Sequence, residues 1–436
     1  MDNYLQEFKK KVNRKKIKIA VVGLGYVGLP LAIEFAKKGF VVFGIEIDRG
    51  RLEHIKDRQS YITDISHQEL RHVLDAKKFS AMGDFGILKE CDVVIICVPT
   101  PLKRKYHPNI FYIKQAVKSI AKNIKKRSLI ILESTTYPGT TEEVILPLLG
   151  QHHLKHNRDF YLSFSPERID PGNAAYPVNK IPKVMGGITK EATDLAVAVY
   201  NQIIDKVVPV SSTRVAEAAK LLENTFRLIN IGLIDELAMM AHKMGIDIWE
   251  VVEAAKTKPF GFMAFYPGPG VGGHCIPKDP LYLYWKAKKF GFKSRFIKLA
   301  SDIISHMPEY IVERVLTILK KNNKALNKIK VLVIGATYKR DVKDLRKSPS
   351  LDIIDIFQRK AIKVSYYDPL IPYLKLNHIN LESIQLNKQH LAKFDCVIIA
   401  TDHSGIDYGF ILRNSQLIFD SRNVYKKITD RKVVRL

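Results

Sequence analysis

Residues 17–46, IKIAVVGLGYVGLPLAIEFAKKGFVVFGIE, decide the fold of the first part of the chain. A short apolar segment runs into a glycine-rich turn, an amphipathic helical segment and a second apolar segment, Val41 to Ile45. The turn, Gly23-Leu24-Gly25-Tyr26-Val27-Gly28, is a GxGxxG pattern in the strand, helix, strand order of a dinucleotide site. Its glycines permit a tight turn, the approach of a pyrophosphate, and close packing of helix on strand.

An acidic residue, Glu46, stands at the end of the second predicted strand. A carboxylate there hydrogen-bonds the ribose hydroxyls and repels a 2′-phosphate, so the pattern predicts NAD rather than NADP. Asp48 is the competing acid, but it lies past the strand end. We expect Asp48 to cap the next helix.

The alternation of strands and helices continues through residue 168. Further strands are predicted at Asp92 to Val98, Leu129 to Leu132 and Phe160 to Phe164. Ligands of open parallel sheets bind beyond the carboxyl ends of the strands. Polar residues follow each strand, and we expect Thr100, Thr135 and Glu167 to face one crevice. The alternative for each is turn or capping chemistry, and the hydroxyl-rich loop is expected to cap a helix that begins near Thr141.

The middle of the chain reads as one long helix, from Ser212 to about Met244. Lys220 and Asn224 are spaced i, i+4, so they project from one face. On a helix with this many apolar neighbours, they are either a surface pair with extended side chains or a polar site against a ligand. A helix of this length suits a connector between domains and a subunit interface.

The loop YPGPGVGGHCIPKDP, Tyr266 to Pro280, contains Cys275, one of four cysteines. Its glycines let the backbone approach a ligand closely, and Lys278 and Asp279 follow within one helical turn of the thiol. A thiol beside a lysine is a candidate nucleophile. The alternative is a small apolar side chain in a turn.

The last third predicts a second α/β unit after a polar linker, Lys324 to Lys330. Strands are expected at Val331 to Gly335, Val364 to Tyr367, Cys396 to Ala400 and Leu417 to Asp420. The loops carry Lys339 and Arg346, which suit a pyrophosphate ligand. We interpret His403 as a structural residue.

The composition, 436 residues with a net charge of +26, 46% hydrophobic and 26% charged, is that of a globular protein of two or three domains. We find no secretory signal and no apolar run that could span a bilayer, so the chain is expected to be cytoplasmic and not inserted in a membrane. Its cysteines show no CxxC spacing, so no zinc site is expected. The lysines are spread along the chain, so we interpret the basic N-terminal run as a solvated leader. A polyanion-binding role is the alternative; nucleic acid is not an expected partner.

Eight motifs in order identify a resemblance that covers nearly the whole chain: GLGYVG, CVPTP, STTYPG, SPER, EAAKLLENTFR, PGPGVGGHCIPKDP, ATYKRDVKDLRKSP and TDHSGIDY. The sequence resembles the UDP-glucose/GDP-mannose dehydrogenase superfamily, the nucleotide-sugar 6-dehydrogenases. Its form is most similar to the UDP-N-acetylglucosamine 6-dehydrogenase branch, with the UDP-N-acetylmannosamine enzymes as the sister group. The resemblance implies two Rossmann-like, doubly wound parallel-sheet domains joined by a long central helix.

The implied division is an NAD-binding domain over 1–210, a central helical domain with the cysteine loop over 211–325, and a UDP-sugar-binding domain over 326–436. The implied assembly is a homodimer or a larger homo-oligomer. The resemblance also implies two successive oxidations at C6 of the sugar, through a thiohemiacetal and a thioester on the cysteine, for surface polysaccharide synthesis.

The resemblance assigns a role to each matching residue. The catalytic set is Cys275, Lys220, Asn224, Asp279, Thr135 and Glu167. The cofactor set is Gly23, Gly25, Tyr26, Val27, Gly28, Glu46, Arg51, Pro99, Thr100, Thr135, Lys278 and Arg346. The substrate set is Glu167, Arg168, Lys220, Asn224, Phe265, Tyr266, Gly272, Tyr338 and Lys339.

Two departures argue against plain UDP-glucose as the substrate. The UDP-glucose enzymes carry a second glutamate where this chain has Pro171. Their arginine from a neighbouring subunit has no clear counterpart, and Lys258 is the nearest candidate.

Overall fold

The computed structural model describes residues 2–62, 65–102, 107–168, 178–320, 328–376, 378–426 and 428–436. The chain divides into two compact units, residues 1–223 with 285–291, and residues 224–284 with 292–436. Pro171 and residues 324–327 of the expected linker lie outside the described residues. The division into three domains therefore remains a prediction.

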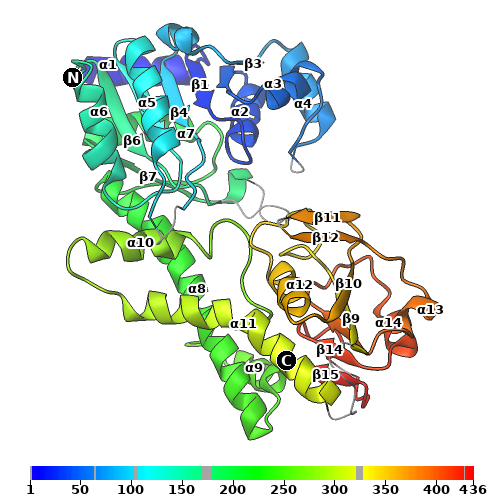
Figure 1. The fold of residues 1–436 in the computed structure, drawn as a ribbon. Helices are drawn as coiled ribbons and strands as arrows, with labels where there is room; N and C mark the ends of the chain where they lie inside the picture. The colour runs from blue at the N-terminus through cyan, green and yellow to red at the C-terminus, as the bar shows by residue number, and fades with distance from the viewer. Residues whose placement is uncertain are drawn as a thin grey trace. The chain divides into compact units, whose positions relative to one another are not determined.

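The first unit is built on a sheet that has eight strands among the described residues, in the order β3-β2-β1-β4-β5-β6-β7-β8 (Figure 1). The strands are β1 (Lys18–Val22), β2 (Val41–Ile45), β3 (Phe79–Met82), β4 (Val93–Ile96), β5 (Ser128–Leu132), β6 (Phe160–Phe164), β7 (Lys183–Gly187) and β8 (Val207–Pro209). The first six are parallel, in the strand order of a Rossmann fold. The predicted doubly wound sheet is confirmed, and β7 extends it antiparallel to β6.

Helices cover both faces of this sheet. They are α1 (Asp2–Asn13), α2 (Gly28–Lys37), α3 (Arg49–Lys56), α4 (His67–Asp75), α5 (Phe111–Asn123), α6 (Leu146–Gly150) and α7 (Lys190–Tyr200), with short turns η1 (Phe85–Glu90), η3 (Thr141–Ile145) and η4 (Val178–Lys180). Alternate residues of a strand point to opposite faces. Ile19 and Val21 therefore join a core with α1, α2 and α7, whereas Ala20 and Val22 join another with α5 and α6.

The N-terminal segment differs from the solvated leader that the sequence predicted. It forms α1, whose Phe8 and Val12 are buried in the core, while Lys10 and Lys11 face solvent. Tyr4 stacks on Tyr161 of β6, with ring centroids 5.5 Å apart. Phe8 and Val12 are spaced i, i+4, which is typical of the buried face of a helix. The prediction of a solvated leader rested on the charge of the segment and did not use this spacing.

The second unit holds a five-stranded parallel sheet among its described residues, in the order β10-β9-β13-β14-β15, and a separate hairpin β11-β12. The strands are β9 (Lys330–Ile334), β10 (Lys363–Tyr367), β11 (Tyr373–Leu376), β12 (Ile379–Glu382), β13 (Cys396–Ile399), β14 (Ile418–Asp420) and β15 (Val433–Arg435). The helices are α9 (Ile248–Lys256), α11 (Arg295–Lys320), α12 (Pro349–Arg359), α13 (Lys388–Leu391) and α14 (Tyr408–Asn414). Val331 and Val333 pack towards α11 and α12, and Leu332 and Ile334 pack towards α13 and α14.

Two helices belong partly to each unit, α8 (Thr213–Met244) and α10 (Asp279–Lys288). The long helix predicted from Ser212 to Met244 is thus confirmed as α8. Within the second unit, α8 passes α11 closely at Gly232, where an added Cβ would lie 2.9 Å from the Cβ of Ala300.

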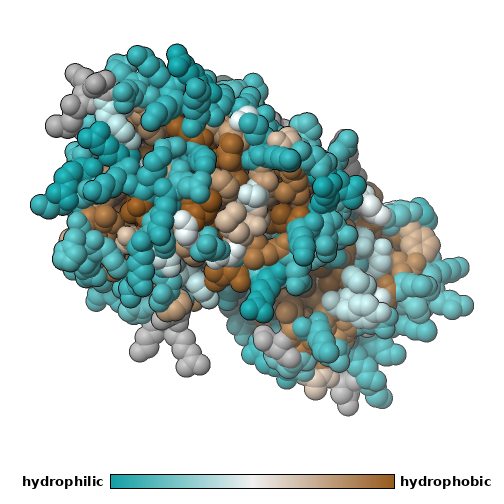
Figure 2. Space-filling model, turned by 90° about the horizontal axis from the view of Figure 1, so that it is seen from above, coloured by the Kyte–Doolittle hydropathy of each residue, from teal (hydrophilic) through white to brown (hydrophobic). Residues whose placement is uncertain are grey.

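The surface is mainly hydrophilic on the face drawn in Figure 2, where hydrophobic residues show in patches between hydrophilic ones. Among the helices of the described ranges, none combines the length and apolar character that a bilayer crossing requires.

Candidate active site

The glycine-rich turn between β1 and α2 has the geometry of a dinucleotide cradle. Gly23 adopts a φ of +92°, which glycine tolerates readily, and a Cβ on Gly28 would fall 1.9 Å from the Gly23 carbonyl oxygen. A Cβ on Gly25, by contrast, would have only Arg51 Nη1 near it, at 3.9 Å. The backbone conformation thus requires the first glycine and packing requires the third, whereas Gly25 leaves its side of the turn open for a pyrophosphate.

The acid at the end of β2 is held close to this turn. Glu46 is buried and accepts hydrogen bonds from the amides of Leu24 at 3.0 Å, Ile47 at 2.8 Å and Asp48 at 3.1 Å. Its Oε2 also lies 3.1 Å from Arg51 Nη1. As predicted, Asp48 caps α3, because its side chain accepts from the Arg51 amide.

Tyr26 and Val27 complete the turn. Tyr26 is 48% exposed, and Val27 precedes α2 without a side-chain cap. The residues present therefore fit a dinucleotide, with its phosphates at the start of α2 and its adenosine ribose at Glu46.

The loops after β4 and β5 meet at the carboxyl edge of the sheet. Thr100, which follows Pro99, donates its hydroxyl hydrogen bond to the Thr135 carbonyl oxygen at 2.7 Å. The structure thus brings Thr100 and Thr135 into contact at this edge. That both face one crevice with Glu167 stays a prediction.

The end of the Thr135 loop is capped differently from the sequence prediction. The first turn, η3, has no side-chain cap from Thr140. Instead, the buried carboxylate of Glu217 on α8 accepts from the Gly139 amide at 2.5 Å, the Thr141 amide at 2.9 Å and the Thr141 hydroxyl at 2.7 Å. Burial raises the pKa of Glu217 to about 7, against the opposing effect of these donors.

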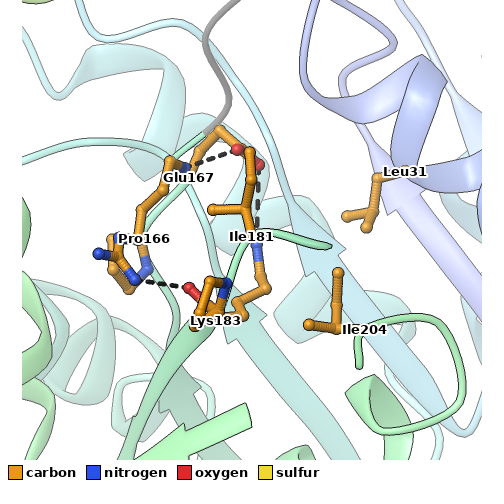
Figure 3. Close-up of a pocket in the computed structure, with 8 residues that line it drawn as sticks. Leu31, Pro166, Glu167, Ile181, Lys183 and Ile204 are labelled. Atoms are coloured by element: carbon orange, nitrogen blue, oxygen red, sulfur yellow. Dashed lines mark hydrogen bonds and ion pairs between the residues drawn. The ribbon is translucent and has the colours of Figure 1, made fainter. Parts of the chain in front are cut away.

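Glu167, after β6, lines a small pocket with Pro166, Ile181, Lys183, Leu31 and Ile204 (Figure 3). Its Oε2 lies 3.6 Å from Lys183 Nζ, and its Oε1 accepts from the Arg168 amide at 2.6 Å. Arg168 turns its guanidinium to Glu223, 2.7 Å away.

The cysteine loop leads directly into α10 in the second unit. Cys275 is exposed, and its carbonyl oxygen accepts from the amides of Lys278 at 3.1 Å and Asp279 at 2.8 Å. Asp279 Oδ2 in turn accepts from Asn224 Nδ2 at 2.7 Å. The buried pair of Asn224 and Asp279 thus lies one turn of chain from the thiol, and Lys220 is buried one turn earlier on α8.

The neighbour of the cysteine, His274, contacts the amine of Lys278 at 3.1 and 3.2 Å. Burial, followed by the cations Lys278 and Arg346, lowers the pKa of His274 to about 4, so its ring is neutral at neutral pH. Burial also lowers the pKa of Lys278.

The residues expected on the nucleotide-sugar side gather around the same loop. A Cβ on Gly272 would lie 2.4 Å from the Tyr338 Cβ, and the Gly273 amide donates to the Arg346 carbonyl oxygen at 2.8 Å. Lys339 follows Tyr338, and the guanidinium of Arg346 makes a forked contact with Asp344 at 2.6 to 3.0 Å. Lys278 and Arg346 lie in the second unit, so their assignment to the cofactor of the first unit remains a prediction.

Phe265 and Tyr266 lie where the cysteine loop begins and pack on the helices. The ring of Phe265 meets Phe226 edge-on at 5.9 Å, and Tyr266 stacks on Trp249. Close by, Asp235 of α8 is buried and accepts from the Gly268 amide at 3.0 Å.

The geometry defines an NAD-binding α/β protein with a cysteine loop, and the comparisons name its class. Models of the UDP-glucose/GDP-mannose dehydrogenase family match the chain over 17–204 (NAD binding domain), 214–304 (central domain) and 332–427 (UDP binding domain). The chain belongs to this family, and NAD is its cofactor.

Two relatives and one solved structure show how similar the chain is to known members. It is 38% identical to a UDP-N-acetyl-D-glucosamine 6-dehydrogenase of Pseudomonas aeruginosa over 89% of this chain and 91% of that protein. It is 35% identical to a UDP-N-acetyl-D-mannosamine dehydrogenase of Pyrococcus horikoshii over 94% and 96%. A structure of the UDP-D-ManNAc dehydrogenase from Pyrococcus horikoshii superposes with a TM-score of 0.87 at 32% identity, covering 96% of this chain and 99% of that one.

Sequence reasoning missed Glu217, Asp235, Lys183 and Glu133. Each has an ionisable side chain that is buried within a largely apolar element or at its edge. Buried charges are rare unless they are paired, so an isolated charge in an apolar segment is the signal that could have found them. His403, which we interpreted as structural, is buried and contacts Asp368 at 3.1 Å.

The first prediction concerns the choice of cofactor. Replacing Glu46 by Ala removes the ribose acceptor and leaves Arg51 available to a 2′-phosphate. We expect NAD affinity to fall roughly tenfold or more, because hydrogen bonds to charged groups contribute about 1.5–3 kcal/mol, and NADP affinity to rise. Fluorescence titration with each dinucleotide measures both. Asp48→Ala is the control and should keep the NAD preference, whereas an unchanged NAD/NADP ratio in Glu46→Ala would contradict the assignment.

The second prediction concerns pH and stability. Burial raises the pKa of Asp235 to about 8, with the Gly268 amide and Arg422 opposing it. The folded pKa lies above the unfolded value of about 3.9, so the folded state binds the proton more tightly and stability falls as pH rises from about 4 to 8. Asp235→Asn should flatten this fall, which has a slope of at most about 1.4 kcal/mol per pH unit. Denaturant unfolding at pH 5, 6, 7 and 8 measures it, and parallel profiles for the two proteins would refute the prediction.

Proposed function

We propose that this protein oxidises C6 of a UDP-N-acetylhexosamine, UDP-N-acetylglucosamine in the first place, to the uronic acid in two NAD-dependent steps, for surface polysaccharide synthesis. The support for the sugar is the 38% identity with the Pseudomonas aeruginosa enzyme named for that substrate. The second candidate is UDP-N-acetylmannosamine, which the Pyrococcus horikoshii structure favours.

The observation that carries the chemistry is the arrangement around Cys275. The thiol is exposed on a glycine-rich loop, and the hydrogen-bonded pair of Asn224 and Asp279 follows within one turn. An alcohol carbon becomes a carboxylate only if an aldehyde is held for a second oxidation. A thiol that adds to the aldehyde retains it covalently.

In the proposed sequence, the sugar hydroxyl loses its proton to Asp279 through a water molecule while Lys220 and Asn224 stabilise the developing oxyanion. Bound in the first unit, NAD would supply the hydride acceptor for both oxidations, which gives two NADH for each sugar. The Cys275 sulfur adds to the C6 aldehyde to form a thiohemiacetal, and loss of the second hydride from C6 gives a thioester.

Hydrolysis of the thioester completes the reaction. A water molecule, deprotonated near Asp279 with help from Glu167 and Thr135, attacks the thioester carbon, and the C–S bond breaks to release the carboxylate and restore the thiol. We assign UDP recognition to the second α/β sheet, with Tyr338, Lys339 and Arg346. The matches of three separate family models support the three-part division over 1–210, 211–325 and 326–436.

We further propose that α8 joins two copies of the chain. Its exposed apolar residues Phe226, Leu233, Met240 and Met244 are 47–61% exposed. Three of them recur every seven residues, so they form one stripe along the helix. A sustained apolar stripe is typical of a surface that a second helix covers.

The third prediction tests the reaction. Purified protein with NAD and UDP-N-acetylglucosamine should yield two NADH per sugar, measured by absorbance against limiting sugar. One NADH would indicate a simple alcohol dehydrogenase. A preference for UDP-N-acetylmannosamine over UDP-N-acetylglucosamine would keep the mechanism and change the substrate.

The same assay tests the nucleophile. Cys275→Ser should not complete multiple turnovers, because its hydroxyl cannot form the thioester. Cys91→Ser is the matched control, since a serine there can still donate to the Ile87 carbonyl oxygen that the Cys91 thiol contacts. Wild-type turnover by Cys275→Ser would refute the thioester scheme.

The fourth prediction tests the interface. Leu233→Glu places a charge in the apolar stripe of α8 and should lower the mass measured by light scattering to that of a smaller species. Gln151→Glu adds the same charge at an exposed position of the first unit and should leave the mass unchanged. A wild-type protein of monomer mass would contradict the proposed interface.

A further inference from the structure

A cluster of charged side chains lies largely buried at the carboxyl edge of the first sheet, and two of its members, Glu167 and Lys183, line the pocket described above. Glu133 follows β5, Glu167 follows β6, and Lys183 begins β7. Lys183 Nζ lies 3.0 Å from Glu133 Oε2 and 3.6 Å from Glu167 Oε2. The side chains of Lys183 and Glu133 are 7% and 0% exposed, and that of Glu167 is 14% exposed. One ammonium thus stands between two carboxylates, and Figure 3 shows its contact with Glu167.

The ammonium group of Lys183 is held in place by the strand pairing of its backbone and by two buried side chains. Lys183 is paired with Val207 through the β7–β8 ladder, so its backbone cannot shift freely. Glu133 Oε1 accepts the hydrogen bond of the Tyr200 hydroxyl, and the Lys183 amine lies 5.1 Å over the Tyr200 ring. Glu133 is therefore held by two partners, and it holds the lysine in turn.

The electrostatics favour a charged lysine in this place. Burial lowers the pKa of Lys183, but Glu133 and Glu167 outweigh it, and the net pKa is raised. Burial raises the pKa of Glu133, and Glu167 adds to that effect. A fixed buried cation is costly unless it is paired, so its pairing constrains the position of the carboxylate above it.

We propose that Lys183 is a positioning residue that holds Glu167 in its working orientation, with Glu133 and Tyr200 as its anchor. The inference rests on the role proposed above for Glu167 in thioester hydrolysis. Glu167 is held at both oxygens, Oε1 by the Arg168 amide and Oε2 by Lys183. Of these two contacts, the one with Lys183 comes from the neighbouring strand β7, and the other comes from the next residue in the chain. We expect loss of Lys183 to lower kcat more than it weakens the binding of sugar or NAD.

The test is a double-mutant cycle between the two residues. Lys183→Met should lower kcat at least tenfold with little change in the KM for NAD, and Lys183→Arg should restore most of the rate. In a Glu167→Gln background, Lys183→Met should lower kcat little further, because the carboxylate that Lys183 positions is no longer present. Equal losses in both backgrounds would overturn the proposal. Should Lys183→Met fail to fold, Lys183→Gln serves instead, since its amide can still donate to Glu133.

A control variant and a second measurement distinguish a role of Lys183 in positioning Glu167 from a general loss of folding or activity. Lys125→Met removes a lysine ion pair with Asp92 at the opposite edge of the sheet and should leave kcat within about twofold. Crystal structures should show the Glu167 carboxylate turned away in Lys183→Met while β7 stays in place; an unmoved carboxylate would overturn the proposal. Wild-type protein without two-NADH turnover would contradict the proposed function, and the crystal structures would still decide the positioning of Glu167.

Discussion

Parallel strand pairing is the constraint on which the first unit depends. Because β1 to β6 all run in the same direction, the segments that follow these strands all leave from the same edge of the sheet. Thr100 and Thr135, 35 residues apart, are in contact for this reason. The same pairing buries polar groups at that edge, and each needs a partner there. Lys183 and Glu133 meet this need for one another across 50 residues of sequence.

The parts that sequence could predict are those with a local signal. The alternation of apolar segments and GxGxxG located β1, α2 and β2, and the strand Phe160–Phe164 was predicted with its observed bounds. The antiparallel β7 could not be predicted in this way, since the direction of a strand depends on the path of the chain before it. Contacts such as that between Glu217 and Gly139 link residues 78 apart, and no local pattern encodes them.

Helix α8 connects these local and long-range features. Glu217, Asn224 and Asp235 are separated by 7 and 11 residues, close to two and three helical turns, so they project from one face. Each contacts a different segment: Glu217 the end of the Thr135 loop, Asn224 the start of α10, and Asp235 the loop that leads to Cys275. A single helix thus supplies polar contacts to the two loops that carry the proposed hydroxyl and thiol groups. This arrangement explains why the helix contains polar residues on a face that is otherwise buried.

The packing of α1 also sets an order of events during synthesis. This helix is synthesised well before the residues that cover it: Tyr4 donates to the Arg127 carbonyl oxygen, 123 positions on, and stacks on Tyr161. Phe8 and Val12 belong to the same core as Leu195 of α7. Until α7 has emerged, these apolar side chains have no native partner, and an incomplete chain exposes them to other proteins. Helix α1 therefore reaches its native packing only after the later parts of the first unit have been made.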